Sequence, residues 1–437
     1  MQMNLPRVLI IGQTFNNKTG GGITQSNLFR GWDKDKLAVA CTAHLLTDSD
    51  KTICDNYYQL GQDEHKWAFP FNYLQKKFPS GILKAEQNSQ SNVTFVNGKN
   101  FRSKLVDDVF YPFLNYSGLT HCISQIKLSS GFRKWLHNFK PDIIYAQGQD
   151  RQRILFALSL EDYLKRPLIF HMMDDWPSSI SNSGPLKKFW KKKIDRDFRI
   201  LLDKSSLLMG ISDAMALEYK KRYHKDFITF HNPLTIDFWK QHQRSNYELN
   251  TPISILYAGR IGLGIQSSLE ITAKAIQLVN EQLGTSIKFV LQTPEKPIWS
   301  DNYSCIEYKN LVPYNQLPKV FSEADFLILP YDFSNESLQY IQYSMPTKAP
   351  EYMISGTPII LFAPDATAVV KYAAEYGWAY IVTKNRTEEL VTAITNLIQN
   401  KSLREGIGQK AKMVAEEKHN SINVSNEFKS LICSLTS

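Results

Sequence analysis

Short apolar runs alternate with longer amphipathic stretches along most of this chain. The first run, RVLIIG (7–12), is rich in β-branched residues and ends in glycine. A glycine-rich segment containing Gly21 and Gly22 follows, and we expect it to be a loop that leads into a helix. Strand, glycine loop and helix form the opening unit of a doubly wound fold. The pattern therefore predicts an α/β fold from the beginning of the chain.

Three further apolar runs in the first half predict strands that end in polar residues. They are PDIIYAQGQ (141–149), RPLIFHMMDDWP (166–177) and SSLLMGISDAM (205–215). A helix with Asp213 near its N-cap follows the last of them. The segment from about 50 to 130 has weak periodicity and many polar and aromatic residues. We expect it to form irregular insertions on the first domain.

The pattern starts again at Ile253. A strand, a glycine turn and a helix with a 3.6-residue apolar period occupy 253–284, and strands alternate with helices from there to about 383. This alternation implies parallel sheets. The sequence thus predicts two Rossmann-like domains facing each other across a cleft, 1–235 and 236–437, with the last helix packing back on the first domain. The polar segment 232–252 contains two prolines and is the expected linker.

Charge narrows the range of partners. The net charge is +9 and the pI about 9.0, which favours anionic partners such as nucleotide phosphates or an anionic membrane.

The five cysteines are scattered, with no C-x-x-C pair, which indicates a reducing compartment and neither a disulfide framework nor a zinc site. The N-terminus has too short an apolar core for a secretory signal, and no run is long enough to span a membrane. We therefore expect a cytoplasmic protein.

The stretch SMPTKAPEYMISGTPII (344–360) carries the strongest candidate site. Lys348 and Glu351 are three residues apart near a predicted helix start, just before an apolar strand. A charged ligand in an α/β protein binds where helix starts and strand ends meet. Arg260 closes the strand of YAGR, where its fork of donors could clamp a diphosphate, and Glu351 could accept hydrogen bonds from a ribose. The alternative for the Lys348 and Glu351 pair is an ordinary surface salt bridge.

The first half offers the other candidates. Gly21 and Gly22 would let a phosphate or sugar approach the backbone, although a flexible loop is the alternative. The spacing is that of neither an ATPase loop nor a dinucleotide fingerprint. His171, Asp174 and Asp175 lie where a strand ends, and one of them could take a proton from an acceptor hydroxyl. Asp175 could equally be a cap or turn residue, and a metal site on the pair lacks a third ligand nearby.

The segment 185–199 is basic, with aromatic residues near helical spacing. As a helix over 187–199 it could lie on an anionic membrane surface. The alternative is a solvated helix whose aromatic side packs on the core, which is the commoner use of an amphipathic helix. Nucleic acid is a poorer partner, because no recognised nucleic-acid motif is present.

These residues together resemble a known family. The glycines after the first strand, Asn232 in HNP, YAGR and above all 344–360 are similar to motifs of GT-B glycosyltransferases, in particular the family 4 enzymes of bacterial polysaccharide synthesis. The resemblance implies an N-terminal acceptor domain and a C-terminal donor domain. It implies that Gly21, Gly22, Asn232, Arg260, Lys348 and Glu351 bind the donor and that His171 lies near the transferred sugar.

The expected reaction is transfer of a sugar from a nucleotide-diphosphate sugar, UDP- or GDP-linked, to a glycan or lipid-linked acceptor in cell-surface polysaccharide or glycoconjugate synthesis. No cofactor and no metal are expected, retention is favoured, and the enzyme would be cytoplasmic or peripheral on the inner face of the membrane. Two departures from the family pattern stand out. Tyr343 occupies the position eight before Glu351 where a glutamate is usual, and Gln266 replaces a lysine six after Arg260. A nucleotide-sugar epimerase and a non-catalytic sugar-nucleotide-binding subunit are the alternatives.

Overall fold

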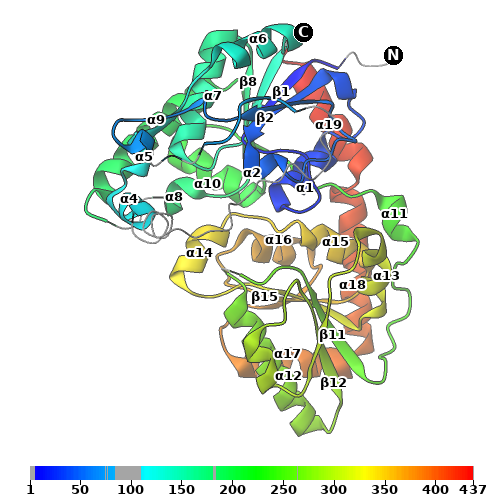
Figure 1. The fold of residues 1–437 in the computed structure, drawn as a ribbon. Coiled ribbons are helices and arrows are strands. Elements are labelled where there is room, and N and C mark those ends of the chain that lie inside the picture. The colour runs from blue at the N-terminus through cyan, green and yellow to red at the C-terminus, as the bar shows by residue number, and fades with distance from the viewer. Residues whose placement is uncertain are drawn as a thin grey trace. The chain divides into compact units, whose positions relative to one another are not determined.

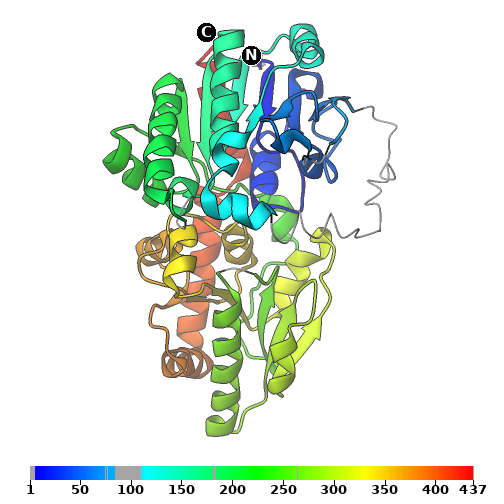
Figure 2. The same ribbon diagram turned by 60° about the vertical axis from the view of Figure 1, so that its left-hand side comes forward.

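The computed structural model describes residues 5–73, 75, 77–83, 110–180, 184–262 and 264–436. The chain folds into two compact units (Figures 1 and 2). The first comprises the chain up to Phe230 together with the C-terminal segment from Ser425, and the second is His231–Val424. Each unit has its own parallel sheet with helices on both faces, so the predicted pair of Rossmann-like domains is confirmed.

The first unit is built on an eight-stranded sheet. Its strand order is β10-β9-β8-β7-β1-β2-β3-β5, and the pairings are parallel except for that of β5 with β3. The chain reverses its direction of growth between β1 and β7, which is the point where such sheets bind ligands. The strands are β1 (Val8–Ile11), β2 (Leu37–Thr42), β3 (Asn56–Leu60), β5 (Gly81–Ile82), β7 (Ile143–Ala146), β8 (Leu168–Met172), β9 (Leu207–Gly210) and β10 (Ile228–Thr229). A separate antiparallel pair joins β4 (His65–Trp67) to β6 (Ser124–Ile126).

The helices of the first unit follow from capping and apolar periodicity. They are α1 (Gly20–Leu28), α2 (Ala43–Leu46), α4 (Tyr111–Ser117), α5 (Thr120–Ile123), α6 (Ser130–Phe139), α7 (Arg151–Leu164), α8 (Trp176–Ser179), α9 (Lys187–Lys204), α10 (Asp213–Tyr223) and the second part of α19 (Ser421–Cys433). Phe428 of α19 packs its ring against Phe29, Tyr145 and Phe230 at centroid distances of 5.0, 6.1 and 5.3 Å. The last helix is therefore part of the first unit's core.

Two expectations about this unit were wrong in detail. The three glycines do not form a loop, because helix α1 already begins at Gly20, where the Thr19 hydroxyl caps it by accepting the Gly22 N–H at 3.2 Å. The segment 50–130 is not wholly irregular either. It contributes β3 to the main sheet, and Tyr57 and Tyr58 of that strand are buried. Residues 84–109 of this segment lie outside the described residues.

The second unit has a six-stranded, all-parallel sheet of order β13-β12-β11-β14-β15-β16. Its strands are β11 (Ile253–Ala258), β12 (Ile287–Gln292), β13 (Ile306–Lys309), β14 (Phe326–Pro330), β15 (Ile359–Phe362) and β16 (Tyr380–Val382). Its helices are α11 (Ile236–Lys240), α12 (Gln266–Leu283), α13 (Leu317–Glu323), α14 (Asn335–Ile341), α15 (Lys348–Ser355), α16 (Ala368–Tyr376), α17 (Thr387–Gln399) and α18 (Lys401–Lys418).

One core of this unit lies between the sheet and helices α12 and α17, which run side by side in Figure 1. Fully buried residues of β11, β12, β14 and β15 form its sheet side. Burial on both faces explains why these strands are continuous apolar runs in the sequence. The result is a rigid edge that holds the loops after the strands in place.

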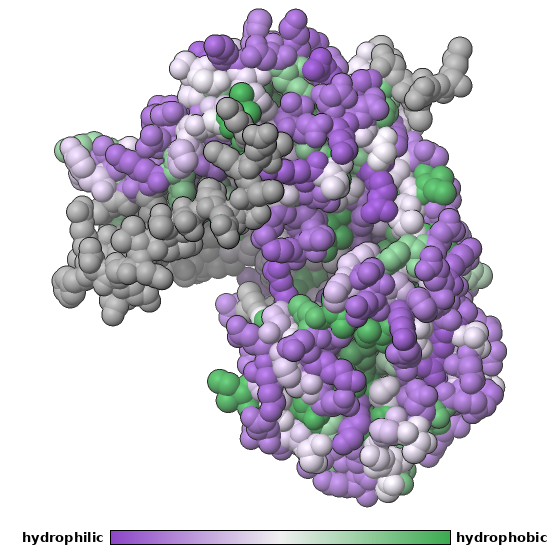
Figure 3. Space-filling view, turned by 45° about the vertical axis from the view of Figure 1, so that its right-hand side comes forward, coloured by the Kyte–Doolittle hydropathy of each residue, from purple (hydrophilic) through white to green (hydrophobic). Residues whose placement is uncertain are grey.

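The outer surface differs from this core. The face in Figure 3 is mostly hydrophilic, and apolar side chains appear on it in small groups. Within the described part of the chain, no helix has the length and apolarity that crossing a membrane requires.

Candidate functional site

In the second unit, the start of α15 is held against the carboxyl end of β11. The Tyr352 hydroxyl accepts the Ala258 N–H at 3.1 Å and lies 3.4 Å from the Ala258 carbonyl oxygen. Tyr352 is fully buried. This contact fixes the helix that carries Lys348 and Glu351 beside the loop that carries Arg260, so the structure brings these three predicted residues to one edge of one sheet.

Lys348 is the first residue of α15, and its ammonium reaches back to β11. It donates to the Tyr257 hydroxyl at 3.1 Å and lies 4.4 Å from the centre of the Tyr257 ring. The Tyr257 hydroxyl in turn donates to the Arg260 carbonyl oxygen. Burial lowers the pKa of Lys348 to about 8, an effect that the neighbouring Glu351 partly opposes. A ligand anion would restore the charged form, because it would replace the missing hydration.

Glu351 lies one turn along the same helix and is 6% exposed. Burial raises the pKa of its carboxyl to about 7, while Lys348 and a hydrogen bond with Tyr314 act in the opposite direction. The Tyr314 ring is stacked on Phe238 at 5.4 Å, which orients its hydroxyl. A carboxylate held this way is poised to accept hydrogen bonds from hydroxyl groups.

Asn232 joins this edge of the second unit through its side chain. Its amide donates to the Thr347 carbonyl oxygen at 3.2 Å, just before α15 begins. His419 Nδ1 donates to the backbone oxygen of Asn232 at 3.2 Å, and the other ring nitrogen accepts from the Tyr372 hydroxyl at 3.0 Å. Burial lowers the pKa of His419 to about 3, so this network is neutral at physiological pH. The side chain of Asn232 is therefore committed to positioning α15.

The loop after β11 carries Arg260 at an exposed position. The next turn of the loop is fixed from β14, since Asp332 accepts the Ser268 N–H at 2.9 Å and donates its own N–H to the Gly264 carbonyl oxygen at 2.8 Å. Gln266, which stands where the family has a lysine, is the exposed first residue of α12. Tyr343 is half-buried in the turn between α14 and α15.

In the first unit, Gly21 and Gly22 occupy the first turn of α1. A Cβ on Gly21 would come within 3.0 Å of the Gln13 amide nitrogen and 3.5 Å of Gln147 Oε1. A Cβ on Gly22 would come within 2.2 Å of the Asn16 side chain, so glycine is required there by packing. Gln13 and Gln147 follow β1 and β7, the two strands that flank the reversal point of the sheet. Gln147 belongs to a polar strand end that the sequence pattern predicts, whereas Gln13 was not singled out from the sequence.

His171 lies within β8 and is completely buried. Its Nδ1 is hydrogen-bonded to the Tyr145 hydroxyl at 2.5 Å, and its Nε2 has no hydrogen-bond partner among the described residues. Burial lowers the pKa of His171 to about 3, which keeps the imidazole neutral. A neutral ring with an unpaired nitrogen retains the capacity to donate to, or accept from, one ligand group.

Asp174 and Asp175 lie in the turn between β8 and α8 and are placed differently. Asp174 is half-buried. Asp175 is 3% exposed, accepts from the Tyr219 hydroxyl at 2.7 Å and pairs with Arg222 at 3.0 Å. The Asp175 carboxylate therefore ties α8 to α10. No group of three or more His, Cys, Asp or Glu side chains suited to a metal ion occurs within the described ranges.

The family model of the group 1 glycosyl transferases matches residues 252–400. This range contains Arg260, Lys348, Glu351 and the sheet edge that holds them. Over this range the second unit is therefore similar to the group 1 glycosyl transferases. No curated protein matches the sequence.

Solved structures extend the likeness in fold over the whole chain. Sucrose-phosphate synthase from Thermosynechococcus elongatus is 11% identical, with 98% of each chain covered and a TM-score of 0.61. HepE from Anabaena, solved with UDP and glucose, is 13% identical over 98% of this chain and 100% of its own, with a TM-score of 0.57. WaaG, a glycosyltransferase of lipopolysaccharide biosynthesis, is 12% identical over 97% and 99%, with a TM-score of 0.54. At these identities the likeness is one of fold, and that fold is GT-B, with two Rossmann-like domains.

Proposed function

We propose that this protein is a glycosyltransferase that moves a sugar from a nucleotide-diphosphate sugar to an acceptor hydroxyl. The observation that carries the proposal is the junction of Lys348, Glu351 and the loop of Arg260 inside the range that matches the group 1 family. Two cations suit a diphosphate, and a buried carboxylate suits the ribose hydroxyls. HepE has been solved with UDP and with UDP-glucose, which favours a UDP-sugar as the donor.

The chemistry follows from where charge develops. As the bond between the anomeric carbon and the diphosphate breaks, negative charge grows on the leaving oxygen. Lys348 and Arg260 would stabilise that charge at a site already fixed by Tyr257 and Tyr352. Such stabilisation requires no metal ion, and transfer that survives a chelator is the expected result. From the fold relationship we also propose that the anomeric configuration is retained. NMR of the product measures that configuration.

In the first unit, we propose that Gly21, Gly22, His171 and Asp174 serve the acceptor and the transferred sugar. His171 has a ring nitrogen with no hydrogen-bond partner among the described residues, and the missing side chain of Gly21 leaves space beside the buried amides of Gln13 and Gln147. Asp175 is the weakest of the predicted catalytic residues, because its carboxylate is occupied by Arg222 and Tyr219.

A lipid-linked acceptor at a membrane surface fits one exposed surface of the first unit. The start of α9 carries exposed lysines and the exposed Phe189, whereas Trp190, Ile194 and Phe198 are buried. Helix α4 adjoins it, because a Cβ on Gly118 would meet the Trp190 ring at 2.4 Å, and α4 exposes Phe113 and Tyr116. Lysines interleaved with exposed aromatic residues are suited to anionic lipid headgroups.

The test is a transfer assay. The protein is incubated with a panel of radiolabelled UDP- and GDP-sugars and with membrane lipid extracts, with and without chelator. Movement of label into the lipid or glycan fraction supports the proposal. If no combination of nucleotide sugar and lipid extract releases a nucleoside diphosphate, the proposal is contradicted.

An epimerase is the second candidate, because one similar structure is a Listeria monocytogenes protein assigned provisionally as a UDP-N-acetylglucosamine 2-epimerase (12% identity, TM-score 0.52). An epimerase would change the sugar of the donor with no acceptor present. NMR of the nucleotide sugar after incubation with the protein alone separates the two reactions.

A further inference from the structure

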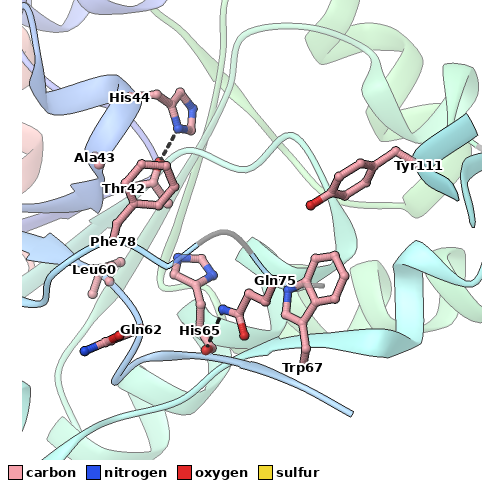
Figure 4. A pocket seen from close by; sticks show the side chains of 11 residues that line it. Thr42, Ala43, His44, Leu60, Gln62, His65, Trp67, Gln75, Phe78 and Tyr111 are labelled. Carbon is pink, nitrogen blue, oxygen red and sulfur yellow. Dashed lines mark hydrogen bonds between the residues drawn. The ribbon is translucent and has the colours of Figure 1, made fainter. Parts of the chain in front are cut away.

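A hollow opens in the first unit, away from the residues discussed so far. It lies at the carboxyl ends of β2 and β3, where Thr42 and Leu60 are the last strand residues, and it is closed by the β4 strand and α4 (Figure 4). Its volume is about 160 Å³. A cavity of roughly 150 Å³ holds one six-membered ring. The hollow is therefore the size of a single sugar ring, and it is open on one side to the rest of a longer molecule.

The lining combines aromatic surfaces with polar groups. Trp67 and Tyr111 meet edge to face at 6.0 Å, and Phe78 lies across from them. Figure 4 shows the Tyr111 hydroxyl and the His65 ring facing the same open space. Aromatic faces bury the C–H side of a ligand while neighbouring polar groups bind its hydroxyls.

One buried polar atom in the hollow lacks a hydrogen-bond partner among the described residues. This atom is Nε2 of His65. The backbone of His65 is fixed by Gln75, whose side-chain amide donates to the His65 carbonyl oxygen at 3.0 Å. A buried polar atom left unpaired costs free energy unless a ligand or water completes it. Nε2 is therefore a specific point of attachment for a hydroxyl group.

The hollow is also uncharged. Among the described residues that line it, none is Asp, Glu, Lys or Arg. Burial lowers the pKa of His65, and burial together with the charge of Arg153 lowers that of His44, so both rings are neutral at pH 7. His44 is hydrogen-bonded to the Thr42 hydroxyl at 3.0 Å. Neutral donors and acceptors suit hydroxyl groups, and Arg153, whose charge acts on His44 and His65, does not line the hollow.

The scaffold beneath the hollow is built to keep this shape. Glu64 is fully buried beneath the turn between β3 and β4, where its carboxylate accepts from the Gly61 N–H at 2.9 Å, the Tyr58 hydroxyl at 3.1 Å and Ser129. Glycine at position 61 lets the backbone of Phe78 and Pro79 pack closely against this turn. A Cβ at position 61 would come within 2.2 Å of the Pro79 carbonyl oxygen. The turn that carries Gln62 and His65 is thus fixed before any ligand arrives.

We propose that this hollow binds one neutral, unphosphorylated sugar ring of the acceptor, with His44, Gln62 and His65 bonding its hydroxyls and Trp67 and Tyr111 covering its apolar face. That the ring belongs to the acceptor rests on the proposed function. The binding of a sugar ring in this hollow does not. A smaller hollow shares Thr42 and Leu60 with it and extends along the same sheet edge to Gly12 and Gln147. At about 20 Å³ the smaller hollow has room for a water molecule but not for a second sugar ring.

The experiment is saturation-transfer NMR with the whole protein and no nucleotide. The probes are methyl glycosides of glucose, galactose, mannose, rhamnose and N-acetylglucosamine, with glucose 6-phosphate as the anionic comparison. Wild type is compared with His44→Ala and Gln62→Ala, which alter exposed side chains, and with His65→Ala. His137→Ala, an exposed histidine on α6, is the matched control. We expect at least one neutral glycoside to bind wild type and the control equally, and about fivefold weaker binding for each lost hydrogen bond.

Each other result overturns the proposal: no neutral glycoside binds, glucose 6-phosphate binds as well, or the pocket variants behave like His137→Ala. Failure of the proposed function has a different signature. If a neutral glycoside binds here but no nucleoside diphosphate binds the second unit, the ring site stands and the transferase proposal does not.

Discussion

The ammonium of Lys348 lies against the backbone of Gly259, so closely that a Cβ at position 259 would come within 2.1 Å of Nζ. Gly259 has a φ of +149°, which L side chains rarely adopt, and its N–H donates to the Gln292 carbonyl oxygen at 2.9 Å. The missing side chain is what lets the first residue of α15 reach the carboxyl end of β11. The proposed diphosphate site thus depends on a residue that carries no functional group.

Gly259→Ala is expected to displace the Lys348 ammonium and to weaken nucleoside-diphosphate binding at least tenfold, the loss of about one charge-assisted hydrogen bond. Gly262→Ala is the matched control, because it lies in the same loop and a Cβ there meets no atom within 4 Å. Isothermal titration calorimetry of both variants measures the difference. Equal affinities for the two variants would show that Lys348 is not held by this contact.

Donor binding is expected to have a bell-shaped pH dependence with its maximum between about 7 and 8. The Glu351 carboxylate forms as the pH rises through about 7, and the Lys348 ammonium is lost as it rises through about 8. The ligand should be a nucleotide sugar, because its diphosphate does not titrate in this range. Glu351→Gln should remove the acid limb and leave the alkaline one. A flat profile from pH 6 to 9 would argue that neither group touches the donor.

Glu351 should also make the ligand-free protein less stable at high pH. Its folded pKa is raised, so the folded state binds the proton more tightly, and the free energy of unfolding falls as the pH rises from about 4.5 to 7. Glu351→Gln is therefore expected to stabilise the protein at pH 8 by about 2 kcal/mol and to have almost no effect at pH 4.5. Thermal unfolding of both proteins across this range tests the sign. Destabilisation at pH 8 would mean that the carboxylate is paired in the free protein.

Asp175→Asn should destabilise the first unit by about 3 kcal/mol, since it removes the buried carboxylate charge that pairs with Arg222. Asp174→Asn, on the half-buried neighbour, should change stability little. Thermal unfolding distinguishes the two. If Asp175→Asn unfolds like wild type but transfers no sugar, the carboxylate acts on the substrate and its ion pair is incidental.

The fold was largely predictable because strands buried on both faces of a parallel sheet are continuous apolar runs. Strand β3 was not predicted. Its sequence NYYQL mixes polar and aromatic residues, and only pairing with β2 buries Tyr57 and Tyr58. The start of α1 was misplaced for a local reason, because a capping threonine outweighs three glycines that otherwise favour a loop.

The charged candidates could be found in the sequence, but the residues that position them could not. Lys348 and Arg260 stand out as cations at predicted element ends. The positions of the Lys348 ammonium and of the Arg260 backbone depend on Tyr257 and Tyr352, which are separated by 95 positions in the sequence. Asp175 also stands out in the sequence, but in the structure its carboxylate is paired with Arg222 of another helix. A sequence shows which groups are available, while tertiary packing decides which of them remain accessible to a ligand.

The most direct test of the central claim is thermal stabilisation of the protein by UDP, GDP, ADP, CMP and their sugars, with wild type beside Lys348→Ala and Glu351→Ala. A ligand that binds only the folded state raises the melting temperature by mass action. We predict that one nucleoside diphosphate and its sugars stabilise wild type and that both variants lose most of the effect. If no nucleotide stabilises wild type, or if the variants respond as wild type does, Lys348 and Glu351 do not form a donor site.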